Sequence, residues 1–186
     1  GGKSHTLAAL LHAVRSRPAL KASAEHWAKV HPYVAEGREQ YGEAKVIKFD
    51  DLADPGDVAV AVFDGEKFDA RDGKEVELGN EESKKIQTMW GWIAWQIDPK
   101  RAFPIVEGQD SDRVAPGGDV VKKLLTEGAG GRPVLILLDE VLKYMERAGA
   151  VALHDSTLQR QAKDFLETLT VEVANSSKAV LVFSLT

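Results

Sequence analysis

The chain of 186 residues contains no cysteine. This lack excludes disulfide-stapled scaffolds and metal sites built on thiolates, and it fits residence in the cytoplasm, where disulfides are rare. Long apolar runs are absent as well, since runs such as Val134 to Leu138 are far shorter than the roughly 20 residues that cross a bilayer. The first residues also lack the pattern of a secretory signal peptide. We therefore expect a cytoplasmic protein without a membrane partner.

The sequence has no strong excess of charge of one sign. Its 24 Lys and Arg residues and 29 Asp and Glu residues leave a formal net charge of -5 at pH 7. Such a charge provides no general attraction for nucleic acid or for an anionic membrane, although a local basic groove is compatible with it. The apolar content of 44% and the charged content of 28% are ordinary for a soluble globular protein. The length suffices for one α/β domain with a sizeable core.

The first four residues, Gly1-Gly2-Lys3-Ser4, match the second half of the phosphate-loop pattern G-x-x-x-x-G-K-[ST]. In that loop, backbone N–H groups and a helix N-terminus cradle the phosphates, the lysine reaches the β and γ phosphates, and the hydroxyl ligates Mg²⁺. We therefore predict that Gly1, Gly2, Lys3 and Ser4 bind ATP and that Ser4 also binds the metal. His5, on the first helical turn, is either a bystander or a further nucleotide contact. Because the first half of the motif is missing, we expect the chain to be a fragment of a longer protein.

A second candidate motif is the run Pro133-Val-Leu-Ile-Leu-Leu-Asp139-Glu140. Apolar residues without alternation, followed by two carboxylates, are typical of a parallel strand that is buried on both faces. Ligands of such sheets bind beyond the carboxyl ends of the strands. Asp139 is then expected to hold Mg²⁺, and Glu140 to deprotonate the water that attacks the γ-phosphate. Alternatively, Asp139 caps the following helix and Glu140 is an ordinary solvated carboxylate.

The rest of the chain predicts alternating strands and helices. Apolar runs predict buried strands over 58–63 and 179–183 beside that over 134–138, and a weaker strand over 45–49. Apolar residues at helical spacing predict helices over 5–17, 20–30, 83–97, 120–125, 141–148 and 158–173. The stretches 66–82 and 99–118 are expected to be loops. This order predicts an α/β fold with a three-layer α/β/α arrangement around a parallel sheet.

Local signals also predict where some helices begin and end. Gly118 or Asp119 is expected to cap the helix over 120–125, and Gly149 to end the helix that follows Glu140. The pattern from Ser156 to Gln159 is that of a capping box.

Three tryptophans, Trp90, Trp92 and Trp95, lie close together in the predicted helix 83–97. On a helix, Trp90 shares a face with Ile93 and Ile97, while Trp92 and Trp95 point elsewhere, so this helix is apolar on more than one side. We interpret it as packed in the core or against another domain. Base stacking on nucleic acid is the alternative, disfavoured because no Lys or Arg interleaves with the rings.

The Gly-Lys-Ser helix, the strand ending in Asp139-Glu140 and a later strand ending in a small polar residue together resemble P-loop ATPases of the AAA+ class. In that class the polar residue on the last of these strands, called sensor 1, touches the γ-phosphate or the attacking water. The resemblance implies this role for Ser184, with Thr186 as the second candidate. The class orders its sheet 5-1-4-3-2, which implies that this chain lacks the central strand and one edge strand. A P-loop domain truncated at both ends would be at best a weak ATPase as an isolated polypeptide.

More narrowly, the chain is similar to a family of large bacterial predicted AAA+ ATPases that is described as a domain of unknown function. The stretches that carry this similarity are Gly1 to Leu7, Val60 to Gly65, Trp90 to Gln96, Ala115 to Gly117, Val134 to Glu140 and Val182 to Leu185. Members are often encoded beside DNA methyltransferases and helicases in anti-phage defence loci. The resemblance implies ATP and Mg²⁺ as cofactors and the remainder of a larger parent chain as a partner. It also implies a homo-oligomer and DNA or methyltransferase partners.

The leading hypothesis is ATP hydrolysis by the intact parent protein. Lys3 would neutralise phosphate charge, Ser4 and Asp139 would hold Mg²⁺, Glu140 would activate water, and Ser184 would sense the γ-phosphate. The rival hypothesis is a nucleotide-dependent interaction module, a switch that orders its loops on ATP and recruits partners with little hydrolysis. A RecA-like helicase core is a third hypothesis, disfavoured because no helicase motif beyond the two Walker elements is present.

Overall fold

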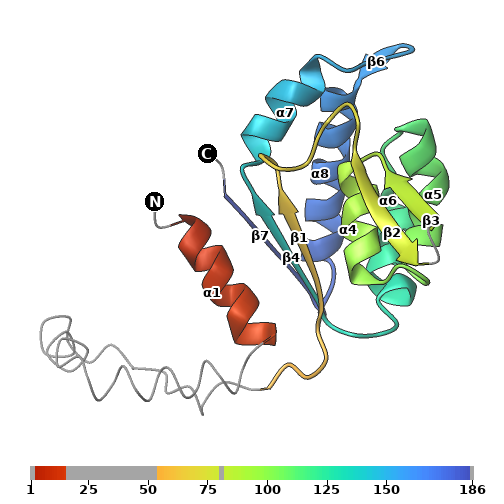
Figure 1. Cartoon of the computed structure of the whole chain (residues 1–186). Helices are drawn as coiled ribbons and strands as arrows, with labels where there is room; N and C mark the ends of the chain where they lie inside the picture. Colours follow the sequence, from red (N-terminus) through yellow and green to blue (C-terminus); the bar gives the residue numbers. More distant parts are fainter. Residues whose placement is uncertain (1–2, 16–53, 80–81, 185–186) are drawn as a thin grey trace, which may run out of the picture. The chain divides into compact units, whose positions relative to one another are not determined.

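The computed structural model describes residues 3–15, 54–79 and 82–184 of the chain (Figure 1). The chain divides into two compact units, Gly1–Leu7 with Asp57–Thr186 and Ala8–Gly56. Helix α1 (Lys3–Arg15) spans the boundary in sequence and confirms the helix predicted after the Gly-Lys-Ser motif. The helix predicted over 20–30 and the strand predicted over 45–49 lie outside the described residues.

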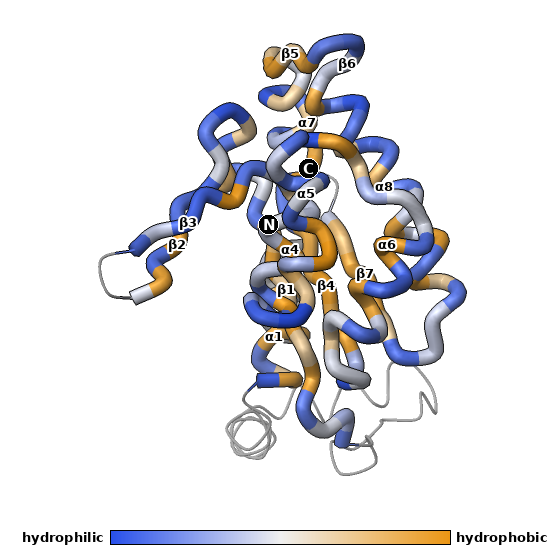
Figure 2. Tube along the Cα trace, turned by 90° about the vertical axis from the view of Figure 1, so that its right-hand side faces the viewer, coloured by the Kyte–Doolittle hydropathy of each residue, from blue (hydrophilic) through white to orange (hydrophobic). Residues whose placement is uncertain are grey.

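Three strands form a parallel sheet in the order β1-β4-β7. They are β1 (Ala59–Asp64), β4 (Val134–Asp139) and β7 (Ala179–Phe183), and they confirm the three strands predicted from apolar runs. β4 lies in the middle and is buried along its length up to Leu138, as a strand with neighbours on both edges and cover on both faces must be. In Figure 2 the strands β1, β4 and β7 carry mainly the hydrophobic colour, which agrees with their apolar sequences.

The described helices that follow β1 share one hydrophobic core with one face of this sheet. They are α4 (Met89–Ile97), α5 (Phe103–Asp112), α6 (Gly118–Lys123), the π-helical turn η2 (Leu124–Gly128), α7 (Val141–Gly149) and α8 (Leu158–Ala174). Alternate strand residues such as Phe63, Ile136 and Leu138 point into this core, because side chains of a strand alternate between its two faces. On the opposite face Leu135 and Leu137 are buried too. The α/β class is therefore confirmed, and the three-layer arrangement stays a prediction.

The charged stretch after β1 was predicted to be a loop, and this prediction is wrong for its second half. Residues Lys74–Gly79 and Glu82–Ile86 form β2 and β3, an antiparallel hairpin. Two lysines attach the hairpin to the aromatic helices, with Lys74 Nζ 4.2 Å from the ring centroid of Trp92 and Lys84 Nζ 4.6 Å from that of Phe103. Local hydropathy could not reveal this, because the long stems of lysine cover apolar rings while their charges stay in water.

Helix α4 begins later than predicted, at Met89 rather than Ser83. The preceding residues pair with β2, and the Thr88 hydroxyl accepts the N–H of Gly91 and so caps the helix. Trp90, Ile93 and Ile97 are buried as predicted. The indole N–H of Trp92 donates to the Val62 carbonyl at 3.2 Å, and the ring of Trp95 stacks edge to face on Phe103. The described tryptophans of α4 thus pack inside this unit, as the core interpretation predicted.

Three further predictions of local structure are corrected. The expected loop 99–118 contains α5, with Pro104 in its first turn, where a missing N–H costs little. Helix α6 is capped by Gly117 rather than Gly118 or Asp119. Thr157 rather than Ser156 caps α8, because Ser156–Thr157 is β6, paired with β5 (Ala152–Leu153) in a short hairpin. The predicted end of α7 at Gly149 is confirmed.

The edge strand β7 is less buried than β1 or β4. In the described part of the chain it pairs with β4 alone, and Val180 and Phe183 are 54% and 49% exposed.

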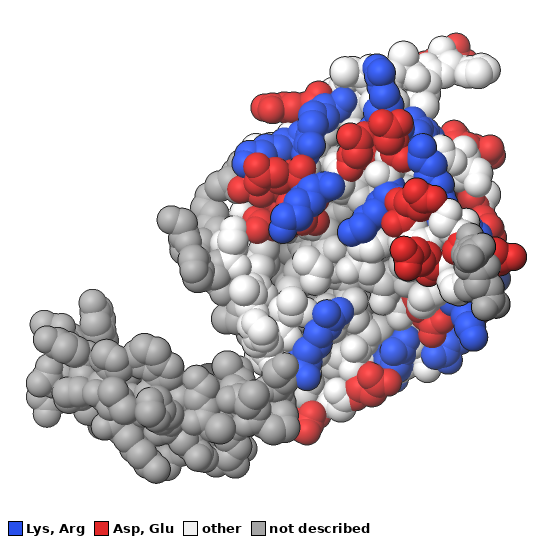
Figure 3. Space-filling view, in the orientation of Figure 1, with Lys and Arg blue, Asp and Glu red and all other residues white. Residues whose placement is uncertain are grey.

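On the visible face in Figure 3, acidic and basic side chains are interspersed, which agrees with the small net charge. Among the described residues, no helix combines the length and the hydropathy that are needed to cross a membrane.

Candidate functional site

The carboxyl ends of the parallel strands bring several polar residues to one edge of the sheet. Asp64 closes β1 and is the register partner of Asp139, which closes β4. Ser184 follows β7 directly, and its N–H donates to the Leu138 carbonyl at 2.9 Å. Glu140 follows Asp139 in the chain. Three residues that the sequence predicts as site residues, Asp139, Glu140 and Ser184, therefore lie at two neighbouring strand ends, the edge at which parallel sheets bind their ligands.

Glu140 has a left-handed backbone conformation, with φ of 53° and ψ of 37°. This conformation costs a residue with a Cβ about 1–2 kcal/mol, so surrounding contacts must hold it. The N–H of Glu140 donates to Oδ1 of Asp139 at 3.1 Å. Glu140 itself is the N-cap of α7, which has no side-chain capping bond. The alternative in which Asp139 caps this helix is therefore not observed, and the two carboxylates occupy a sharp turn between β4 and α7.

Gly65 makes the closest backbone approach to this turn. Its N–H donates to the Asp139 carbonyl at 2.8 Å. A Cβ added at Gly65 would lie 2.2 Å from the carbonyl oxygen of Glu140 and 3.1 Å from Cβ of Tyr144. Only glycine therefore allows the end of β1 to pack against the start of α7, and this packing helps to hold the strained turn at Glu140.

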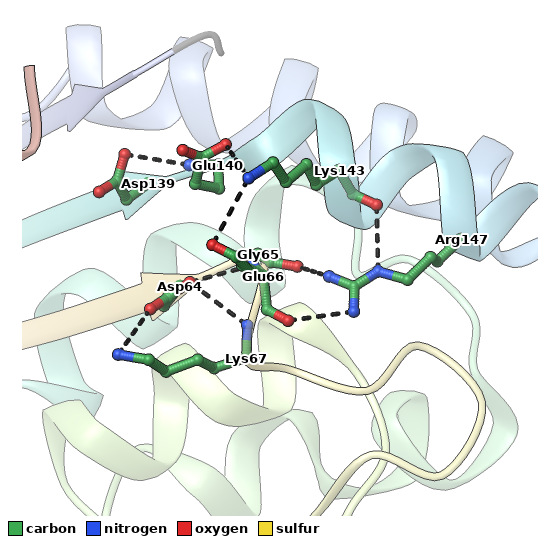
Figure 4. A network of polar contacts seen from close by, with 8 residues as sticks. All are labelled: Asp64, Gly65, Glu66, Lys67, Asp139, Glu140, Lys143 and Arg147. Atoms are coloured by element: carbon green, nitrogen blue, oxygen red, sulfur yellow. Dashed lines mark hydrogen bonds and ion pairs between the residues drawn. The ribbon is translucent and has the colours of Figure 1, made fainter. Parts of the chain in front are cut away.

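Two cations on α7 bind the loop that follows β1 (Figure 4). Arg147 donates from Nη1 to the Glu66 carbonyl at 3.0 Å and from Nη2 to the Gly65 carbonyl. Lys143 lies between two carboxylates, with Nζ 3.3 Å from Oε2 of Glu140 and 3.4 Å from Oε2 of Glu66. The Glu140 carboxylate, followed by that of Glu66, raises the pKa of Lys143. This network joins the loop after β1 to the carboxylate predicted to activate water.

Tyr144 anchors the start of α7 on β1 and on the loop that follows β1. Its ring packs edge to face on Phe63, with centroids 5.0 Å apart, and on Phe68, with centroids 6.0 Å apart. Burial raises the pKa of its phenol. The first two turns of α7 are thus fixed by an apolar contact on one side and by ion pairs on the other.

Asp64 also takes part in the local structure at this edge. Its Oδ1 accepts the N–H groups of Glu66 at 3.0 Å and Lys67 at 3.3 Å, and its Oδ2 lies 3.2 Å from Nζ of Lys67. The carboxylate thereby folds the chain back after β1, as aspartates commonly do in turns. We assign it a structural role in the loop rather than a ligand role.

The predicted phosphate-loop residues lie at the start of α1. Lys3 and Ser4 are its first two residues, and Ser4 is exposed. Gly1, Gly2 and Thr186 lie outside the described residues, as do the side chains of Lys3 and His5. A lysine and a hydroxyl on the first helical turn fit the local arrangement of a phosphate loop. Their convergence with Asp139 and Glu140 on one triphosphate stays a prediction.

The described residues contain no group of three or more His, Asp or Glu side chains that could enclose a metal ion. Mg²⁺ that accompanies a nucleotide is usually bound by one or two protein oxygens together with phosphates and water. Asp139, which is partly exposed at the end of β4, is suited to be one such oxygen ligand.

The sequence did not predict three residues of this edge, Gly65, Lys143 and Arg147. One signal was present for Lys143, which follows Glu140 by three residues, the spacing at which helical side chains meet. Gly65 follows the apolar strand β1 as Glu140 follows β4, but only the pairing of those strands brings the two residues into contact. Arg147 binds backbone carbonyls of a distant loop, which no local pattern records.

A family model described as the DUF499 N-terminal domain matches residues 1–186. The chain belongs to this family. Comparison with curated proteins and with solved structures found no match. The DUF499 match covers both the Gly-Lys-Ser segment and the carboxyl edge of the sheet, so both belong to the domain that defines the family. The description of this family names no activity.

Proposed function

We propose that this domain binds ATP and hydrolyses it with Mg²⁺, as the motor or switch domain of a larger bacterial protein. The observation that carries the proposal is the set of polar strand ends at one edge of the parallel sheet. Asp139 and Glu140 follow the central strand, and Ser184 follows its neighbour. A carboxylate pair beside a small hydroxyl is the arrangement that supports metal binding, water activation and sensing of a γ-phosphate.

The strand order gives further support. In the AAA+ class the second, third and fourth strands are neighbours, the third carries the carboxylate pair, and the fourth carries sensor 1. The order β1-β4-β7 fits that segment of the sheet. The edge of β7 that is unpaired among the described residues is where the class has the strand that leads into the phosphate loop. The AAA+ assignment within the DUF499 family is therefore part of this proposal.

Each residue has a distinct role in the proposed reaction. Lys3 neutralises charge on the β and γ phosphates, and Ser4 with Asp139 holds Mg²⁺. Glu140 accepts a proton from the attacking water. Ser184 hydrogen-bonds the γ-phosphate or that water, and Gly1, Gly2 and His5 contact the nucleotide. An anti-phage role, with DNA or a methyltransferase as partner, follows only from the family resemblance.

The test uses the full-length protein that carries this domain. Glu140→Gln should keep ATP binding, measured by calorimetry, and lower steady-state phosphate release by about a hundredfold or more, because it removes the general base. Glu146→Gln is the matched control, since Glu146 is exposed on the same helix and should leave both quantities unchanged. Phosphate release that stays the same in Glu140→Gln would remove Glu140 from this role.

A second candidate function is a nucleotide-dependent switch with little hydrolysis. The network of Lys143, Arg147 and the loop after β1 favours it, because that network links the candidate site to an exposed surface. Measuring phosphate release with and without DNA separates the two functions. Slow release that DNA does not stimulate supports the switch, and stimulated release supports the motor.

A further inference from the structure

The Glu140 carboxylate has two oxygens in different surroundings. Oε2 is buried and has no hydrogen-bond donor in the described part of the chain, and its charge partner there is Nζ of Lys143 at 3.3 Å. Oε1 is not among the buried polar atoms that lack a partner in the described part of the chain, and 21% of the Glu140 side chain is exposed. The lysine therefore contacts one oxygen and leaves the other open at the edge of the sheet.

This asymmetry matters for a general base. A carboxylate that takes a proton from water must present one oxygen to that water in a stable orientation. Glu140 has a flexible side chain on a strained backbone, so its backbone alone does not determine where the carboxylate points. A charge-assisted contact to Oε2 restricts that rotation and offsets the cost of burying an oxygen without a hydrogen bond.

Lys143 is itself held in place. It extends from the first turns of α7, which Tyr144 anchors on the sheet, and its ammonium also lies 3.4 Å from Oε2 of Glu66. Glu66 belongs to the loop whose carbonyls Arg147 binds. The lysine thus has a second carboxylate that keeps its ammonium near the site (Figure 4).

We propose that Lys143 is a positioning residue for Glu140, holding Oε2 so that Oε1 faces the water that attacks ATP. The proposal rests on the proposed ATP hydrolysis and extends it to a residue outside the Walker motifs. Lys143 does not touch the nucleotide in this scheme. Its removal should therefore disturb the chemical step and leave nucleotide binding intact.

The experiment measures kcat and KM for ATP in the full-length protein. Lys143→Met keeps the length of the side chain and removes its charge, and it should lower kcat by about tenfold, the scale expected for a misplaced base, with KM changed less than about twofold. Lys143→Arg should restore most of the turnover, because it restores the cation. Lys163→Met is the matched control, since Lys163 forms an exposed ion pair with Glu167 on α8 at 3.5 Å.

Several outcomes would overturn the proposal. Wild-type turnover in Lys143→Met would mean that the lysine does not orient the base. Turnover higher than wild type would mean that the lysine restrains the base. An equal loss in Glu66→Gln would mean that the lysine acts through the loop. A shift of more than a few degrees in the unfolding midpoint of Lys143→Met, with no rescue by arginine, would indicate a structural role. If the wild-type protein releases no phosphate from ATP, the proposed function fails first and this proposal fails with it.

Discussion

At the scale of single residues, Gly65 is the position where the end of β1 and the start of α7 come closest. Its missing side chain leaves room for the Glu140 carbonyl, which would lie 2.2 Å from a Cβ. The obstacle is backbone rather than the end of a flexible side chain, so a larger residue must displace the turn that carries Glu140. Backbone shifts of this kind typically cost about 1–3 kcal/mol.

We predict that Gly65→Ala lowers the free energy of unfolding by about 1–3 kcal/mol and lowers ATP turnover, because it moves the proposed base. Urea unfolding and phosphate release measure the two effects. Gly108→Ala is the control, since Gly108 lies in α5 and nothing surrounds its Cβ position within 4 Å. Alanine there should keep or raise stability by up to about 1 kcal/mol. Full stability and activity in Gly65→Ala would contradict the close packing described here.

Asp110 is a buried carboxylate far from the strand ends, and only 1% of it is exposed. It accepts the backbone N–H groups of Gln87 at 3.1 Å and Thr88 at 2.9 Å, and the Thr88 hydroxyl. Burial raises its pKa, and the hydrogen bond from Thr88 is the largest opposing influence, with the charge of Arg113 a smaller one. Asp110 therefore holds the residue that caps α4.

The raised pKa makes stability depend on pH in a defined direction. Between the ordinary pKa and the raised folded one, the unfolded chain releases a proton that the folded chain keeps. The proton that folded Asp110 keeps thus stabilises the fold at low pH, and this stabilisation is lost as the pH rises through the folded pKa. The lowered pKa values of Asp69 and Asp98 act in the opposite direction, so the comparison must be made with an Asp110 variant.

We predict that Asp110→Asn, which cannot titrate, loses this dependence. The stability difference between wild type and variant should be larger at pH 4 than at pH 7, as measured by urea unfolding at both values. Asp110→Ala cannot titrate either, so it should show the same pH trend, and it should cost about 1–3 kcal/mol because it leaves N–H groups without an acceptor. A stability difference that grows with pH would show that the pKa of Asp110 is not raised in the folded state.

At the scale of elements, α4 closes the outer edge of β1. Oε1 of Gln96 accepts the N–H of Val62 at 3.1 Å, and Nε2 donates to its carbonyl at 2.7 Å. The amide thus takes the place that a neighbouring strand would occupy. An edge blocked in this way is not free to pair with another strand. Among the described residues β1 is one edge of the sheet, and β7, the other, has no such cover there.

We predict that Gln96→Leu, which has similar size, costs about 1–3 kcal/mol because the partly buried N–H of Val62 loses its acceptor. Thermal and urea unfolding measure the loss. Gln159→Leu is the control, since Gln159 is exposed on α8 and the change there should be within about 0.5 kcal/mol. Equal stability of the two variants would show that the amide does not stabilise the edge.

Several elements were predictable because their signals are local. The strands β1, β4 and β7 follow from apolar runs, and α8 follows from apolar residues at helical spacing. The hairpin of β2 and β3 and the helix α5 were not predictable. The hairpin depends on lysines that pack on Trp92 and Phe103, and α5 depends on core contacts of Val106. Both are tertiary contacts that override weak local preferences.

At the scale of the whole molecule, the sheet decides which residues become neighbours. Asp64 and Asp139 are far apart in the chain and become register partners only because β1 pairs with β4. Ser184 comes beside Leu138 in the same way. The interspersed charges of Figure 3 offer no large field of one sign on that face.

The amino-acid sequence by itself determined the identities of the candidate residues and the strands that carry Asp139, Glu140 and Ser184, because buried strands and their polar ends are written in consecutive residues. Only the tertiary structure decided that Gly65 touches the turn at Glu140 and that Lys143 also reaches Glu66 in the loop after β1. These contacts join segments whose proximity depends on strand pairing and on the packing of α7 against the sheet. Such packing is a property of the whole core, and no short stretch of sequence encodes it.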